Sequence, residues 1–132
     1  MIGIDTNVLV RHLVQDDETQ ADLADAFLQR NCTADDPGFV NGIVLCELVW
    51  TLERTYGYAR ADIARMLDNL FITRELHIEN RGLAVSALDR FKRSNIEFSD
   101  ALICEGNIAA GCTATATFDR KAGRQPGFIA VR

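Results

Sequence analysis

The chain has 132 residues, of which 48% are hydrophobic and 25% charged, and its formal net charge is −5 at pH 7. This length and composition predict a single soluble globular domain over residues 1–132, with one hydrophobic core. The acidic balance argues against a protein that coats nucleic acid through charge alone, because such proteins are normally basic. No apolar run is long enough to span a bilayer and no signal-peptide pattern is present, so we expect a cytoplasmic protein with no membrane partner.

The charges and cysteines are distributed unevenly along the chain. Residues 1–66 contain eleven of the nineteen acidic residues and five of the fourteen basic ones. After Asp119 no acid follows, and the basic residues there are Arg120, Lys121, Arg124 and Arg132. The four cysteines form no CxxC pair, which predicts reduced, packed thiols and argues against a disulfide or a zinc site.

Short apolar runs alternate with segments of helical spacing. A buried strand, a tight turn and a helix are expected within MIGIDTNVLVRHL, where Thr6 and Asn7 favour a helix start. Further helices are expected at about 16–30, 42–56, 60–71, 80–93 and 99–111, and further strands at 38–40, 76–78, 113–118 and 128–131. This alternation predicts an α/β fold whose parallel sheet is covered on both faces.

Local signals refine these helices. Asn41, Asn80 and Ser99 are expected to cap helices, whereas Ala59 offers no side-chain acceptor. Gly57 and Gly111 are expected to follow helix ends. The helix at 42–56 is apolar almost all round and is therefore expected to be buried. We expect Trp50, Phe27 and Phe91 in the core, and His12 and His77 in packing or surface positions.

Four acids lack the basic neighbours that surface acids usually have. Asp5 and Asp119 follow apolar runs, while Glu47 and Asp100 lie in the first halves of helices among apolar residues. None of the four has Lys or Arg three or four residues away, whereas Asp62, for example, has Arg65. A helix cap would by itself explain Asp5. A buried, unpaired carboxylate is unfavourable by several kcal/mol, so burial of these side chains would call for a cation.

The carboxyl ends of parallel strands lie at one edge of a sheet, so we expect the four acids there. Ligands that are all oxygen suit Mg²⁺ or Mn²⁺ and do not suit zinc or copper. A divalent cation held by carboxylates supports phosphodiester hydrolysis, because it acidifies water and stabilises the charge that develops on the phosphate.

Four separated motifs, MIGIDTNVLVRHL, LCELVWTL, FSDALI and TFDRKA, resemble those of a PIN domain in order and spacing. More narrowly, the chain resembles the short VapC-type toxins of toxin–antitoxin pairs, over nearly its whole length. The resemblance implies a three-layer α/β/α fold with a five-stranded parallel sheet. It also implies a Mg²⁺- or Mn²⁺-dependent endoribonuclease that forms a homodimer and is silenced by a small antitoxin.

The resemblance also implies roles for individual residues. Asp5 would be the first metal ligand and Asp100 the acid that shares this metal most directly. Glu47 would bind the metal through water or orient the nucleophile, and Asp119 would be the fourth acid, for a second cation. Supporting contacts to the acids or the phosphate would come from Thr6, Asn7 and Thr117. The chain departs from the family pattern at His12, where an aromatic is common, and at Ala59, where a capping Ser or Thr is common.

Other interpretations of the same residues stay open. The expected substrate is RNA with unpaired regions, such as a tRNA loop, and its phosphates would meet Arg11, Arg120, Lys121 and Arg124; each of these could equally be a solvated surface charge. A phosphoaspartyl protein would also place an acid at Asp5, but the haloacid-phosphatase pattern requires a second Asp where this chain has Asn7. A catalytically silent scaffold that binds RNA or a protein is disfavoured because all four acids are present.

Overall fold

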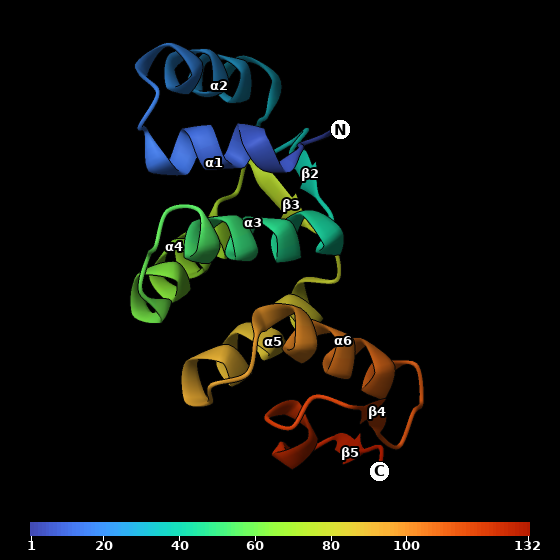
Figure 1. Cartoon of the computed structure of the whole chain (residues 1–132). Helices are drawn as coiled ribbons and strands as arrows, with labels where there is room; N and C mark the ends of the chain where they lie inside the picture. Colours follow the sequence, from blue (N-terminus) through green and yellow to red (C-terminus); the bar gives the residue numbers. More distant parts are fainter. The chain divides into compact units, whose positions relative to one another are not determined.

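The computed structural model describes all 132 residues and has an α/β fold. The chain divides into two compact units, unit 1 (Met1–Arg81) and unit 2 (Gly82–Arg132). Each unit combines helices with a small parallel sheet (Figure 1). None of the helices is both long and apolar enough to cross a lipid bilayer.

Unit 1 contains a three-stranded parallel sheet with the strand order β1-β2-β3. Its elements are β1 (Ile2–Gly3), α1 (Thr6–Val14), α2 (Glu18–Asn31), β2 (Gly38–Val40), α3 (Gly42–Arg54), α4 (Arg60–Ile72) and β3 (Leu76–Ile78). In this sheet Phe39 is in register with Gly3 on one side and with His77 on the other. Alternate residues such as Val40 and Ile78 are buried, as the period-two geometry of strands requires.

The core of unit 1 consists of aliphatic side chains from its sheet and helices. The largest that are fully buried are Leu9, Val40, Leu45, Leu48, Leu52, Ile63, Leu67 and Ile78. Close packing is visible at Gly38, where an added Cβ would lie 2.8 Å from Cys32 Sγ and 2.9 Å from Ile4 Cγ1. A side chain at this position of β2 would therefore overpack the core.

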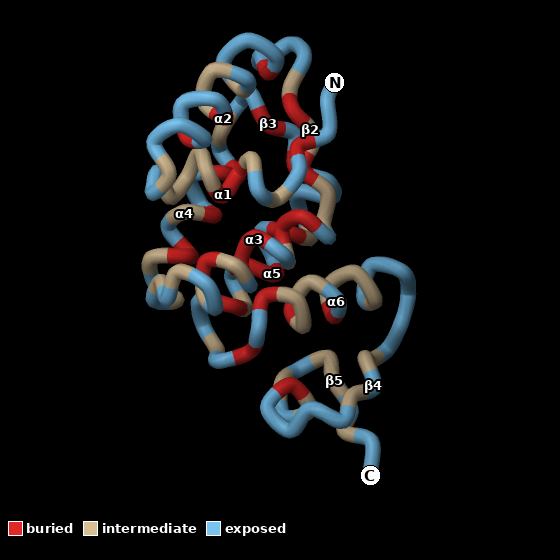
Figure 2. Tube along the Cα trace, turned by 45° about the horizontal axis from the view of Figure 1, so that its top comes forward, coloured by how far each residue is buried: buried red, intermediate tan, exposed pale blue.

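Unit 2 contains two helices and a two-stranded parallel sheet. Its elements are α5, which begins at the unit boundary (Arg81–Arg93), α6 (Phe98–Ala109), β4 (Thr115–Thr117), the short 3₁₀ helix η1 (Ala122–Arg124) and β5 (Phe128–Ala130). Phe91 and Phe98 are both buried and meet edge to face, with ring centroids 6.3 Å apart. Figure 2 shows the buried residues of both units concentrated on the helices and the first sheet.

Arg90 connects the parts of unit 2. Its Nε lies 3.1 Å from Glu105 Oε1, its Nη2 donates to the Pro126 carbonyl, and its guanidinium lies 5.9 Å from the centroid of the Phe128 ring. Both members of the Arg90–Glu105 pair are largely buried. The pair therefore connects α5 to α6, and Arg90 also connects α5 to the turn that precedes β5.

The prediction of one five-stranded sheet is wrong, because the strands form one sheet of three and one of two. Apolar runs predict that a segment is a strand, but they do not specify which distant strands pair. The strands are also short: β1 has two residues and the others three. The parallel direction of every pair was predicted correctly.

Most helix signals in the sequence are confirmed. Asn41 caps α3 by accepting the Val44 N–H at 2.9 Å, and α4 begins after Ala59 without a side-chain cap. Gly57 and Gly111 follow α3 and α6 with φ of 69° and 100°. Ser99 does not cap α6, because this helix already begins at Phe98.

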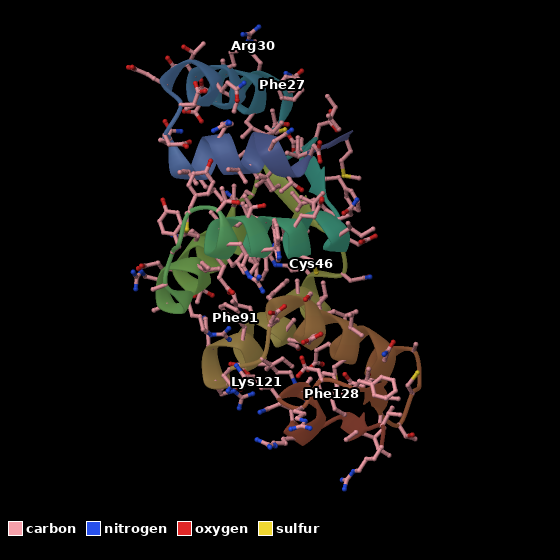
Figure 3. The ribbon with its side chains drawn as sticks, viewed as in Figure 1. Phe27, Arg30, Cys46, Phe91, Lys121 and Phe128 are labelled. Carbon is pink, nitrogen blue, oxygen red and sulfur yellow. The ribbon has the colours of Figure 1, made fainter.

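The prediction that α3 is buried is wrong for its outer face. Ile43 and Trp50 lie on its outer face with exposed fractions of 74% and 57%. Phe27, expected in the core with Phe91, is also exposed and extends from α2 (Figure 3). An apolar sequence marks a residue as able to be buried, but a surface helix can still carry apolar side chains on its outer face.

Candidate functional site

Asp5 lies at the point where β1 gives way to α1. It is the N-cap residue of α1, with φ −81° and ψ 160°, and its Oδ1 accepts the Thr6 N–H at 2.8 Å. Because capping uses one carboxylate oxygen, the cap explanation and a role in chemistry are compatible for this side chain. Asp5 is exposed to solvent.

Glu47, in the middle of α3, is joined to this turn by a hydrogen bond. The Thr6 hydroxyl donates to Glu47 Oε1 at 2.9 Å, across 41 residues of sequence. Thr6 thus contacts both candidate acids of unit 1, Asp5 through its backbone N–H and Glu47 through its side chain. The contact fixes the carboxylate of Glu47 beside the N-terminus of α1, where the positive end of the helix dipole favours negative charge.

A pocket of about 310 Å³ contains this pair of acids. Asp5, Thr6, Asn7 and Glu47 line it together with Arg11 and Tyr56, among others. Arg11 is already engaged within the chain: its Nε donates to Gln20 Oε1 at 2.6 Å and its Nη1 to Asp16 Oδ1 at 3.2 Å. Its Nη1 also lies 3.5 Å from the Tyr56 hydroxyl oxygen. Partial burial raises the pKa of Tyr56, and the nearby Asp16 raises it further.

The second pair of acids lies in unit 2. Asp100 is in the first turn of α6, and Asp119 follows β4, where its Oδ1 accepts the Ala122 N–H at 2.8 Å and so caps η1. Partial burial raises the pKa of Asp100, and the negative charges of Asp119 and Glu97 raise it further. Asp100 and Asp119 are therefore near enough to repel each other.

Glu97 was not among the site residues predicted from the sequence. It is the residue before α6, and its carboxylate adds to the negative field at Asp100. Its spacing of three residues from Asp100 was the available signal, since residues three apart at a helix start lie on one side. The prediction rested on the absence of basic neighbours at that spacing, and an acidic neighbour did not enter it.

Burial of the acids, the condition under which the sequence would call for a cation, is not observed. Asp5, Glu47 and Asp119 are exposed, and Asp100 is intermediate; no polar or charged residue of the chain is fully buried. The apolar neighbours of Glu47 in sequence do not bury it, because Ile43 and Trp50 share its exposed helix face. For Asp100, partial burial is the main cause of its raised pKa.

The donor set fits a hard cation in its chemistry, since all four candidates offer carboxylate oxygens. Asp5, Glu47 and Asp119 each use one oxygen in a hydrogen bond within the chain. No group of three or more His, Cys, Asp or Glu side chains is arranged to hold a metal ion. The structure brings the acids together as two pairs, Asp5 with Glu47 and Asp100 with Asp119, one in each unit.

The other predicted site residues have different surroundings. Thr117 Oγ1 accepts the Asp119 N–H at 3.0 Å, so it contacts that acid through the backbone. Asn7 lines the pocket of unit 1. Arg120, Lys121 and Arg124 are exposed in and beside η1, and Figure 3 labels Lys121 there.

Comparison with known proteins gives one family. The PIN domain family model matches residues 2–127, which include all four candidate acids and cross the boundary of the two units. No curated protein matches the chain. Because the match spans almost the entire sequence, the chain belongs to the PIN domain family.

Proposed function

We propose that this chain is a Mg²⁺- or Mn²⁺-dependent endoribonuclease that hydrolyses RNA phosphodiester bonds. PIN domains are typically nucleases, and the observation that supports the proposal most is that the match to this family spans residues 2–127, the range in which all four candidate acids lie. The proposed catalytic and metal-binding residues are Asp5, Glu47, Asp100 and Asp119. A bound divalent cation supplies Lewis acidity toward the phosphate and lowers the pKa of water.

The acids of the chain have distinct proposed roles. Asp5 and Asp100 are proposed as direct metal ligands, and Asp119 as the fourth acid, for a second cation. Glu47, held by the Thr6 hydroxyl at 2.9 Å, orients the attacking water. Partial burial raises the pKa of Asp100, and repulsion by Asp119 raises it further. The repulsion supports binding of a cation there, because positive charge would stabilise the ionised pair.

RNA contacts outside the acids are proposed for basic side chains. Arg120, Lys121 and Arg124 are exposed and available to phosphates. Arg11 lines the pocket of Asp5 and Glu47 but contacts Asp16 and Gln20, so a phosphate would have to compete with these partners. Asn7 and Thr117 are proposed as supporting residues near the acids.

The biological setting is also part of the proposal. We infer a VapC-type toxin that acts in the cytoplasm as a homodimer, with all of residues 1–132 forming one domain. A small cognate antitoxin would silence it. Support comes from the resemblance of the four sequence motifs to those of the short toxins, whereas the family match itself establishes only the PIN domain.

Cleavage of a labelled RNA with unpaired regions tests this function. We expect cleavage with Mg²⁺ or Mn²⁺ and none with a chelator. Because water attacks phosphorus and one P–O ester bond breaks, the new ends should carry a linear phosphate and a hydroxyl, with one oxygen from solvent water. A 2′,3′-cyclic phosphate, or cleavage in chelator, would reject the proposed chemistry.

The same preparation separates the alternatives. A phosphoaspartyl protein would retain labelled phosphate after acid denaturation and would bind beryllium fluoride, which we do not expect here. A silent scaffold would bind RNA without cleaving it under any of these conditions. Either outcome would replace the nuclease proposal while leaving membership of the PIN family intact.

A further inference from the structure

Phe118 is the most exposed large hydrophobic residue of the chain, with 83% of its surface accessible. It directly follows β4 and directly precedes Asp119, one of the four acids. Most aromatic side chains of a small protein contribute to its core, and the fully buried Phe91 and Phe98 do so in the same unit. Phe118 contributes nothing comparable to the packing of unit 2.

The backbone on both sides of Phe118 is fixed by hydrogen bonds. Thr117 belongs to β4, and its Oγ1 accepts the Asp119 N–H at 3.0 Å. Asp119 in turn accepts the Ala122 N–H through Oδ1 at 2.8 Å and the Gly123 N–H through its carbonyl at 2.9 Å. The ring therefore projects from a structured turn, and binding it would order little additional backbone.

The surroundings of Phe118 are positively charged in sequence. Arg120, Lys121 and Arg124 follow within six residues and are exposed, and no acid comes after Asp119. Exposed aromatic rings combined with basic residues are typical of surfaces that bind single-stranded nucleic acid, where bases stack on the rings and cations follow the phosphates. Phe27, the other exposed phenylalanine, lies on α2, where acids outnumber bases.

We propose that Phe118 is a stacking platform for an unpaired base of the RNA substrate. Arg120 and Lys121 would contact the phosphates that flank this base. The inference rests on the proposed nuclease function and adds to it, because it restricts the substrate to RNA with an unstacked base next to Asp119. A second copy of the chain is the less favoured occupant, since a symmetric contact here would bring the same basic residues together.

Tryptophan fluorescence tests the stacking directly. Trp50 is the only tryptophan, so the double variant Trp50→Phe/Phe118→Trp carries its single tryptophan at the proposed platform. In chelator, to prevent cleavage, we expect an unstructured oligouridylate to quench this fluorescence. An abasic ribose-phosphate strand of equal length and an RNA duplex should leave it unchanged. Binding detected by anisotropy without quenching would overturn the proposal.

Affinity measurements provide the second test. Phe118→Ala should weaken binding of the oligouridylate about tenfold, and Phe118→Tyr should restore most of it, because stacking requires a ring. Phe118→Leu should behave like the alanine variant, and Phe27→Ala, the matched control, like the wild type. Full affinity in Phe118→Ala, rescue by leucine, or a change confined to oligomeric state would each contradict a stacking role.

Failure of this inference is distinguishable from failure of the nuclease proposal. If the wild type cleaves RNA and Phe118→Ala cleaves it with unchanged KM, the stacking role is wrong and the nuclease function stands. If the wild type cleaves no RNA with any divalent cation, the nuclease function is wrong. Quenching at position 118 by unpaired RNA would still assign the platform in that case.

Discussion

Thr6 links the two candidate acids of unit 1, Asp5 and Glu47, with two hydrogen bonds, one from its backbone and one from its side chain. Its backbone N–H is satisfied by the Asp5 carboxylate, and its hydroxyl holds Glu47 Oε1 at 2.9 Å. A side chain that orients a proposed functional carboxylate in this way is a positioning residue. Removal of the Thr6 hydroxyl should therefore change metal binding more than it changes the free energy of unfolding.

Thr6→Val should lower metal-dependent RNA cleavage by about tenfold or more, because the Glu47 carboxylate loses the hydroxyl that holds it. The apparent affinity for Mg²⁺ should fall in parallel, while the free energy of unfolding without metal changes by less than about 1 kcal/mol. Thr6→Ser keeps the hydroxyl and should restore activity. Thr51→Val, in the same pocket, is the control. Equal losses in both valine variants would contradict a specific role for Thr6.

His12 and Asp25, both in unit 1, form a contact between two titratable side chains. His12 Nδ1 lies 2.6 Å from Asp25 Oδ1, and Gln15 Nε2 lies within 3.3 Å of both Asp25 oxygens. The hydrogen bond with His12 is the main reason that the pKa of Asp25 is lowered from its ordinary value of 3.8; partial burial opposes it. The pair joins α1 to α2.

A lowered carboxyl pKa stabilises the fold at pH values above 3.8, and this contribution is lost as the pH falls through the folded-state pKa. Asp25→Asn should therefore reduce the free energy of unfolding at pH 6, by at most about 1 kcal/mol because the pair is partly exposed. The difference from wild type should shrink below pH 4. Denaturant titrations at several pH values measure this, with the exposed Asp22→Asn as control. A difference that grows toward low pH would show the opposite linkage.

Helix N-termini differ in how well they are capped. The Asn41 side chain accepts the Val44 N–H at 2.9 Å, whereas Ala59, at the corresponding position of α4, accepts nothing. Ala59 has φ −68° and ψ 152°, which a capping serine adopts readily. The sequence already predicted this difference from the residue types alone.

Ala59→Ser should raise the free energy of unfolding by about 0.5–1 kcal/mol, and Asn41→Ala should lower it by about 1 kcal/mol. The serine hydroxyl would satisfy a backbone N–H in the first turn of α4, and the alanine would leave the Val44 N–H without its partner. Chemical denaturation measures both changes. Ala59→Val, which adds no acceptor and is as poor a cap residue as alanine, should have little effect; a gain equal to that of serine would show that capping is not the cause.

Helix ends were more predictable from the sequence than the pairing of strands or the exposure of side chains. Helix ends at Asn41 and Gly111 depend on neighbouring residues, so their signals lie within a few positions. β4 pairs only with β5, in a sheet separate from that of β1, β2 and β3. Which strands pair depends on segments far apart in the sequence, and no local pattern specifies it. Likewise, Trp50 was assigned to the core from its apolar neighbours, although the outer face of α3, which also carries Glu47, is exposed. The sequence predicted that Thr6 contacts the acids or the phosphate, but it did not predict that its partner is Glu47.

The family match covers 2–127 as one PIN domain, while the chain forms two compact units. If residues 1–132 fold as a single domain, as we propose, thermal unfolding should be one cooperative transition. Fluorescence of Trp50 reports on unit 1, and far-UV circular dichroism reports on the helices of both units. Coincident midpoints are expected. Two separate transitions in circular dichroism, only one of them seen by Trp50, would show two independent domains.

The central claim is that acids from both units are needed for metal-dependent RNA cleavage, and single-turnover cleavage rates with Mg²⁺ test it most directly. Asp5→Asn in unit 1 and Asp100→Asn in unit 2 should each reduce the rate at least about a hundredfold. Asp89→Asn is the matched control, since Asp89 is exposed and pairs with Arg93 at 2.6 Å; its rate should equal that of the wild type. Full activity in either Asp5→Asn or Asp100→Asn would contradict the claim.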